Sequence, residues 1–415
     1  MFVYIGLLAS ATLLIFSLFS KSYKKPFIAS ILLSPIISST WRYKFAEVSL
    51  IDAYFVLFIT IFLIRVFIKK EKIYEIPYQR FFLLYFFIII LTSLNIYMRG
   101  GLLTASEFFF KSIYIPFCLY LSFVYFSKKR DARALIACFV IAVIFPLIFI
   151  FFQKITGYTW RYHATRGIIR SQGVYHDVVT ARIFVVQALI GIYLYWHYFL
   201  DKTRNLLKNL LVLISVLCLI ALYFFYSKTI VLTLIIWLFL FSFLRKKFYA
   251  LPMALGLFIL FNSILGNKLL YDMKTLFSKE IEYVGGNIPS DYVLAGRGWI
   301  WKMYSLEWKH LPFLQKIIGA GMSHTHFHND FLRVLYSGGI LLLILYLSMI
   351  LFFSAKVFSR FLKERKIIHF AALLGLAYYL VESLGQVAGF YSIIQPATWG
   401  LVGLSLNREL EWAKK

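Results

Sequence analysis

The chain has 415 residues, of which 61% are hydrophobic and 20% aromatic, and it carries a formal net charge of +26. Soluble domains are about 45–50% apolar, so this composition exceeds what a water-soluble fold can bury. The charge would suggest nucleic acid as a partner of a soluble protein, but no basic tail or aromatic-basic module supports that partner. We therefore expect a polytopic membrane protein whose basic loops face anionic membrane lipids.

Apolar segments recur along the chain at lengths near the roughly 20 residues that a helix needs to cross a bilayer. Because lipid cannot satisfy backbone polar groups, these segments predict helices, and the alternating pattern of a membrane barrel is absent. Segment 27–41 is short, so we expect an all-α fold of twelve or thirteen transmembrane helices in one domain, residues 1–415. The segments lie near 2–20, 27–41, 48–64, 81–97, 112–126, 134–152, 178–200, 209–226, 230–244, 248–265, 334–355, 367–385 and 390–406.

The connecting loops fall into two alternating sets that differ about threefold in their density of Lys and Arg. Cytoplasmic loops carry the excess of positive residues in membrane proteins. The poorer set contains the two longest loops, 153–177 and 266–330, which we therefore expect on the external face. The second of these is long enough to carry short helices of its own.

Three of the eight histidines stand at alternate positions, His324, His326 and His328, at the end of loop 266–330. In an extended segment His326 points away from the other two, and no cysteine or acidic cluster completes a zinc site around them. A histidine at this surface suits proton transfer, because its pKa lies near operating pH. A metal site and simple interface histidines are the alternatives, and the second applies most to His324 and His326.

The stretch HFHNDFLRVLYSGGILLLILY resembles the signature of the O-antigen ligase and polymerase superfamily: His328-Asn329, nine residues, then Gly339. Leu342 stands where that family often has Gly, Thr or Tyr. AGRGWIWKMYSLEW, which contains Arg297, is similar to the family's arginine-led amphipathic helix.

Two further stretches carry the resemblance. FFYSKTIVLTLIIW is similar to the family's Ser-Arg segment, with Lys228 in place of the arginine, and RGIIRSQGVYHDVV, with Arg166 and Arg170, resembles its external loop. The resemblance covers roughly residues 160–405. It implies a multi-pass enzyme of the bacterial inner membrane, with its active site on the periplasmic face.

The implied reaction moves a glycan from undecaprenyl diphosphate to an acceptor hydroxyl, with inversion and without metal or cofactor. His328 would be the general base. The departing diphosphate needs fixed cations, and arginine forks match phosphate oxygens, so we expect Arg170, Lys228 and Arg297 to bind it. Supporting residues are expected among Arg166, Arg182, Asn329, Asp330 and Arg333, of which Arg333 can instead pair with Asp330 or Glu382.

Two acceptors fit the same pattern. A ligase transfers the glycan to lipid A–core, which we favour because the His-Asn-x9-Gly motif is its hallmark, whereas a polymerase transfers it to a second carrier-linked glycan. A flippase for lipid-linked sugars is the alternative from another class. Transporters of that kind often have inverted repeats and broken helices at the bilayer midplane, and the sequence has no repeat.

Overall fold

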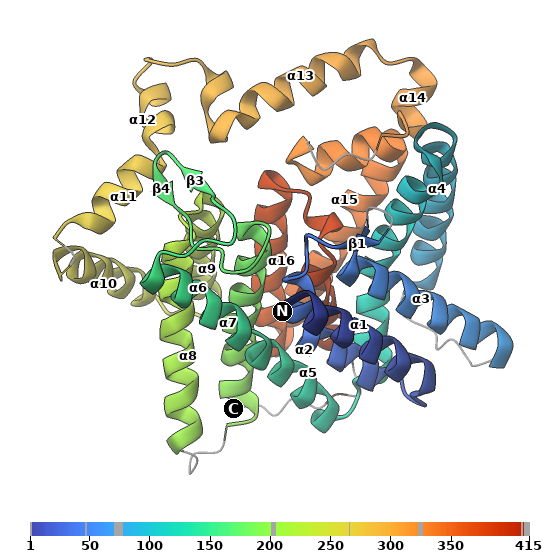
Figure 1. Cartoon of the computed structure of the whole chain (residues 1–415), viewed down its shortest axis with the longest axis horizontal. Coiled ribbons are helices and arrows are strands. Elements are labelled where there is room, and N and C mark those ends of the chain that lie inside the picture. The colour runs from blue at the N-terminus through green and yellow to red at the C-terminus, as the bar shows by residue number, and fades with distance from the viewer. Residues whose placement is uncertain are drawn as a thin grey trace.

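A computed structural model of the chain describes residues 2–45, 48–69, 78–200, 205–264, 266–322, 327–407 and 410. The structure is 82% helical, and Figure 1 shows most of the long helices gathered in one bundle. The first ten helices are α1 (Phe2–Phe19), α2 (Lys24–Ser38), α3 (Leu50–Lys69), α4 (Gln79–Tyr125), α5 (Lys129–Ala142), α6 (Ile144–Thr156), α7 (Val178–Tyr198), α8 (Asn205–Phe224), α9 (Lys228–Leu244) and α10 (Ala250–Ile264).

The expected short helices of loop 266–330 are present and arch over one end of the bundle, at the top of Figure 1. They are α11 (Lys268–Leu276), α12 (Ser278–Val284), the 3₁₀ turns η1 (Ser290–Tyr292) and η2 (Leu294–Gly296), α13 (Arg297–His310) and α14 (Phe313–Ile318). The hairpin β3 (Ala164–Thr165) and β4 (Ile168–Ile169) lies at the same end. We call this end the loop face. A second two-residue pairing joins β1 (Lys44–Phe45) to β2 (Val48–Ser49).

The chain ends in α15 (Asp330–Glu364), α16 (Ile367–Gly385) and a broken segment. That segment was expected as one helix over 390–406, but it consists of the 3₁₀ turns η4 (Ala388–Phe390) and η5 (Ser392–Ile394), the π turn η6 (Pro396–Gly400) and α17 (Leu401–Leu406). Irregular backbone at membrane depth is tolerated where protein buries it. Here residues 396–406 are all buried.

Helix α4 folds back on itself. The rings of Phe86 and Phe109 lie 6.0 Å apart, whereas 23 residues of straight helix would separate them by about 35 Å. The reversal is at Gly101, whose φ of 80° and ψ of 175° are non-helical. The loop expected at 98–111 is therefore helical apart from this glycine, and α4 covers both predicted segments 81–97 and 112–126.

Seven helices of the described chain are long and apolar enough to cross a membrane, or eight if α10 and α11, bent by 109°, form one span. The expected twelve or thirteen spans are not confirmed. Helices such as α2, with 15 residues, and α9, with 17, are too short to qualify, and α4 qualifies once although it has two arms. The multi-pass membrane class itself agrees with the structure.

Helices α7 and α16 form the centre of the bundle, because 78% of the apolar window of each is buried, against 28% for the peripheral α8. Both have structured ends at the loop face. The Asp177 side chain caps α7 by accepting a hydrogen bond from the Thr180 amide at 2.7 Å, a contact that satisfies an otherwise unpaired N–H. Helix α16 ends at Gly385. The central helices thus deliver polar groups to the loop face.

Candidate functional site

Five basic side chains from four elements gather at the loop face, and we call them the basic cluster. They come from the 157–177 loop with its hairpin, the first turns of α7 and α9, and the start of α13: Arg166, Arg170, Arg182, Lys228 and Arg297. Arg182 and Arg297 both lie within electrostatic reach of Arg170, and Arg166 and Arg297 within reach of Lys228. All three residues predicted to bind diphosphate are therefore brought together, with Arg166 and Arg182 beside them.

Arg170 is positioned by the side chain of Gln153 near the end of α6. The Gln153 amide donates to the Arg170 carbonyl at 3.1 Å and accepts from the Gly173 amide at 2.7 Å, so one side chain holds both ends of a short turn. The Arg170 guanidinium donates to the Tyr226 carbonyl at 2.9 Å. Its Nε is buried and finds no acceptor among the described residues. An unsatisfied buried donor on a cation is a place where an anion would bind favourably.

Arg182 is buried and joins α7 to α16. Its Nε donates to Glu382 Oε1 at 2.6 Å, and its Nη2 donates to the second carboxylate oxygen. A third bond runs from Nη1 to Ser227 Oγ at 2.8 Å. This bidentate pair fixes both charges in position, and the bond to Ser227 links it to the residue before Lys228.

Lys228 begins α9 and is bound by an acidic residue that the sequence analysis did not single out. Its Nζ lies 2.5 Å from Glu280 Oε1 on α12, and Arg166 Nη2 lies 3.8 Å from the other oxygen of Glu280. Arg166 also donates to the Thr275 and Leu276 carbonyls. In the sequence Glu280 is distinguished only by the scarcity of acidic residues in a basic chain. Its partners, Lys228 and Arg166, lie far away along the chain, so their contacts with Glu280 could not be predicted.

Arg297 opens α13 and approaches the end of α16. A Cβ built on Gly385 would lie 3.2 Å from Arg297 Nη1 and 3.5 Å from Thr229 Oγ1, so the absence of a side chain at Gly385 lets these groups meet. Burial, followed by repulsion from Arg182, lowers the pKa of Arg297. The same two causes lower the pKa of Arg170 to about 10. The Arg170 guanidinium therefore stays charged at neutral pH.

The charge of the cluster is only partly compensated. Among the described residues, two carboxylates, Glu280 and Glu382, contact these five cations, so three of the positive charges are not balanced by them in this partly buried site. Like charges held together in a low dielectric repel strongly. Burial is the main cause of the lowered pKa values of Arg170 and Arg297, and repulsion within the cluster adds to it. A bound polyanion would relieve that repulsion.

His328 lies directly before α15 in a left-handed backbone conformation, with φ of 46°. Non-glycine residues rarely adopt this conformation, and such strain gathers at functional sites. The next residue, Asn329, caps α15 by accepting from the Leu332 amide at 3.0 Å, and its Nδ2 reaches the Leu384 carbonyl at 3.5 Å. His324 and His326 lie outside the described residues, so the metal alternative that needs them is not tested.

The end of α16 connects His328 to the basic cluster. Leu384 contacts Asn329 on one side, and the adjacent Gly385 borders Arg297 and Thr229 on the other. The structure therefore brings the histidine motif, α13 and the start of α9 to one place. The sequence offered these residues only as separate stretches of a resemblance.

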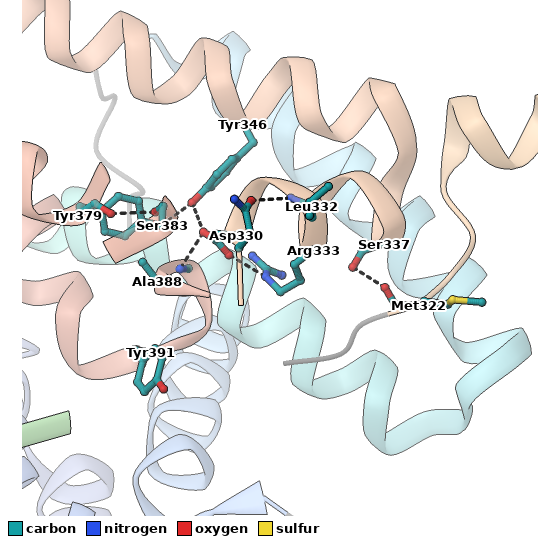
Figure 2. Close-up of polar contacts among 12 residues, drawn as sticks. Met322, Asp330, Leu332, Arg333, Ser337, Tyr346, Tyr379, Ser383, Ala388 and Tyr391 are labelled. Carbon is teal, nitrogen blue, oxygen red and sulfur yellow. Dashed lines mark hydrogen bonds and ion pairs between the residues drawn. The ribbon is translucent and has the colours of Figure 1, made fainter. Parts of the chain in front are cut away.

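Asp330 and Arg333, predicted as supporting residues, form a buried polar hub instead of contacting the cluster directly (Figure 2). Arg333 Nε donates to Asp330 Oδ1 at 2.8 Å, while the Tyr346 hydroxyl and the Gly389 amide donate to Oδ2 at 2.5 and 2.9 Å. Tyr379 extends the hub by a hydroxyl contact of 2.7 Å to Tyr346. Of the two partners considered for Arg333, Asp330 is the one found. The hub fixes the helix that begins after His328.

Neither a protein-family model nor a curated protein matches this chain.

Proposed function

We propose that this chain is a membrane glycosyltransferase that moves a glycan from a polyprenyl diphosphate carrier to an acceptor hydroxyl. The observation that carries the proposal is the convergence of five cations near the end of α16. The same helix end contacts Asn329, the residue after a histidine in a strained backbone conformation. A diphosphate supplies the anion that such a cluster lacks. The resemblance of 160–405 to the O-antigen ligase and polymerase superfamily supports the same reading.

In the proposed reaction the acceptor oxygen attacks the anomeric carbon from the side opposite the diphosphate. The new C–O bond forms as the bond from that carbon to the diphosphate oxygen breaks, so the configuration inverts. The electron pair leaves with the diphosphate, whose added charge Arg170, Lys228 and Arg297 stabilise. His328 accepts the acceptor proton and later releases it to water.

The acceptor divides the proposal into two activities. Lipid A–core would make the chain a ligase, which remains our preference, and a second carrier-linked glycan would make it a polymerase. Both reactions use the same base and the same cations. The enzyme would act in the bacterial inner membrane with the loop face in the periplasm, as the charge of the loops predicts.

The test is transfer by purified protein, with an undecaprenyl-diphosphate glycan as donor and lipid A–core as acceptor, in the presence of EDTA. We expect product from the wild type and a loss of at least 100-fold in His328→Ala, since general base catalysis contributes roughly 10²–10⁴-fold. His328→Asn is the control for backbone strain, because asparagine tolerates the left-handed conformation. It should be as stable as the wild type and as inactive as His328→Ala.

The cation role is tested with Lys228→Ala, matched by Lys302→Ala on α13. The Lys302 side chain is 61% exposed, and its ammonium pairs with Asp291. Lys228→Ala should raise the KM for donor at least tenfold, and Lys302→Ala should leave it unchanged. If the only products are longer carrier-linked chains, the enzyme is a polymerase. Full activity of His328→Ala would rule out the base, and carrier flipping without transfer would favour the transporter.

A further inference from the structure

A cavity of about 300 Å³ lies between the end of α2, the starts of α3 and α7, and the irregular segment after α16. This volume is at the lower end of the range for small-ligand sites, roughly 300–1,000 Å³. Its lining combines aromatic and ionisable side chains, among them Trp41, Asp52, Lys111, Asp177 and Tyr391. The catalytic scheme above uses none of them.

The polar groups of the cavity are held in fixed positions. Asp52 accepts from Ser49 Oγ at 2.7 Å and from Ser392 Oγ at 2.5 Å, and it pairs with Lys111 at 3.1 Å. On the α7 side, Asp177 accepts from the Tyr391 hydroxyl at 3.2 Å. Two preorganised carboxylates with neighbouring hydroxyl groups can accept and donate hydrogen bonds in several directions.

The rest of the wall is mixed: it includes the apolar residues Ile37, Leu50, Ile51, Val387, Phe390 and Ile393 and the polar residues Ser38, Thr40, His176 and Thr180. Two carboxylates disfavour an anion, and the Lys111 ammonium disfavours a metal cation. An acyl chain would displace water from these polar groups without offering them a further hydrogen bond, which carries a desolvation cost. A sugar ring presents both C–H faces and hydroxyl groups, so it matches the mixed lining better than any of these.

The cavity is connected to the proposed catalytic site through the segment after α16. Tyr391 lies within electrostatic reach of both Arg182 and Arg297. Gly389, two residues earlier, donates to Asp330, and Asp330 follows His328 by two residues. Figure 2 shows Tyr391 on the same segment as Ala388, next to which the Gly389 amide donates to Asp330. The segment after α16 therefore links the cavity to Arg182 and Arg297 on one side and to the residues that follow His328 on the other.

We infer that this cavity binds one sugar ring of the acceptor and so places its hydroxyl beside the donor. The inference rests on the proposed function, because it assigns the acceptor to a subsite of the same enzyme. Asp52, Asp177 and Tyr391 are positioning residues that recognise hydroxyl groups. The diphosphate binds elsewhere, on the basic cluster.

Binding without turnover tests the inference. Full-length protein in detergent is probed by saturation-transfer NMR with the methyl glycosides of glucose, galactose and N-acetylglucosamine, and by calorimetry with farnesyl diphosphate. Thr180→Met fills the cavity, since Thr180 lies in its wall. Thr156→Met, at an exposed residue of α6, is the matched control. Asp177→Asn and Tyr391→Phe serve as second variants if Thr180→Met does not fold.

We expect at least one glycoside to give a signal that falls at least tenfold in Thr180→Met and persists in Thr156→Met. The Kd for farnesyl diphosphate should stay within twofold in both. The cavity assignment is overturned if the wild type gives no glycoside signal, or if Thr180→Met and the second variants leave the signal unchanged. In either case, binding of farnesyl diphosphate would still support the proposed function. Decanoate is the acyl-chain probe in the same NMR experiment. If decanoate binds to the wild type but not to Thr180→Met, and no glycoside binds, the cavity holds an acyl chain and the inference fails. If farnesyl diphosphate also fails to bind, the proposed function falls with it.

Discussion

The Asp330 carboxylate accepts a hydrogen bond of 2.5 Å from the Tyr346 hydroxyl, although the two residues are 16 apart on the same helix. A straight helix would separate them by about 24 Å, so α15 doubles back between them. The reversal is at Gly339, with φ of 69° and ψ of −167°. Gly339, the glycine that closes the His-Asn-x9-Gly motif, thus brings Tyr346 back against Asp330, which follows His328 by two residues.

Gly339→Ala should destabilise the protein strongly. A Cβ at this position would lie 2.1 Å from the Ile317 carbonyl oxygen, and the backbone conformation alone costs an L-residue about 1–3 kcal/mol. Thermal unfolding in detergent should show a lower Tm. Gly256→Ala on α10 is the control, because no atom lies within 4 Å of its built Cβ, and it should stabilise by about 0.5–1 kcal/mol. Equal Tm values for the two variants would contradict the fold-back.

Glu382→Gln should cost about 3–5 kcal/mol of stability, because it leaves the Arg182 guanidinium buried without its carboxylate. Denaturant titration in micelles measures the loss. Glu307→Gln, at an exposed residue of α13, should change stability by less than about 0.5 kcal/mol. The double variant Arg182→Met with Glu382→Met should recover part of the loss and yet bind farnesyl diphosphate more weakly. Unchanged stability of Glu382→Gln would show that the pair is dispensable.

Glu280→Gln should tighten the binding of farnesyl diphosphate. The Glu280 carboxylate occupies Lys228 and approaches Arg166, so it competes with an incoming phosphate. A partly exposed ion pair contributes about 1 kcal/mol at most, which corresponds to about a fivefold lower Kd. Calorimetry gives the Kd, with Glu282→Gln, an exposed neighbour, as the control. Weaker binding by Glu280→Gln would mean that Glu280 organises the cations and does not compete for them.

Stability should fall as the pH drops below 6.5. Burial, and then repulsion from Arg170 and Arg161, lower the pKa of His163 in the folded state. The unfolded chain therefore binds the proton first, and stability declines from the unfolded pKa near 6.5 down to the folded pKa. Melting curves at pH 7.5 and 5.5 should differ less in His163→Gln than in wild type. An identical difference in both proteins would assign the acid sensitivity to other groups.

The sequence predicted the helical membrane class well, because a long apolar run can satisfy its backbone in lipid only as helix. It failed where single residues decide the path. Gly101 and Gly339 turn helices back on themselves, and a hydropathy window that averages over about 20 residues does not register one glycine. Segment 390–406 is apolar but contains Pro396 at the start of its π turn, so its composition indicated a span where the backbone is irregular.

For the candidate site, the sequence identified the cations and His328 but could not bring them together. Their convergence depends on Gly385 and on the turn that Gln153 holds, and both are tertiary contacts between segments far apart in the chain. Glu280 and Tyr391 escaped notice for the same reason. An acid or a tyrosine gains meaning only from the partner it meets in the folded protein.

The arm formed by α11 to α14 is fastened to the bundle at both ends. At one end Glu280 and Arg297 meet the basic cluster, and at the other Ala320 accepts from Arg99 at 2.8 Å and donates to the Tyr336 carbonyl at 2.8 Å. The second half of α13 also packs on α15, where the rings of Trp308 and Tyr336 lie 5.5 Å apart. A peptide bond cut at the exposed Lys309 would therefore leave two fragments that stay associated. The protein should tolerate being expressed as two complementary chains split near Lys309, which offers a route to label either half alone.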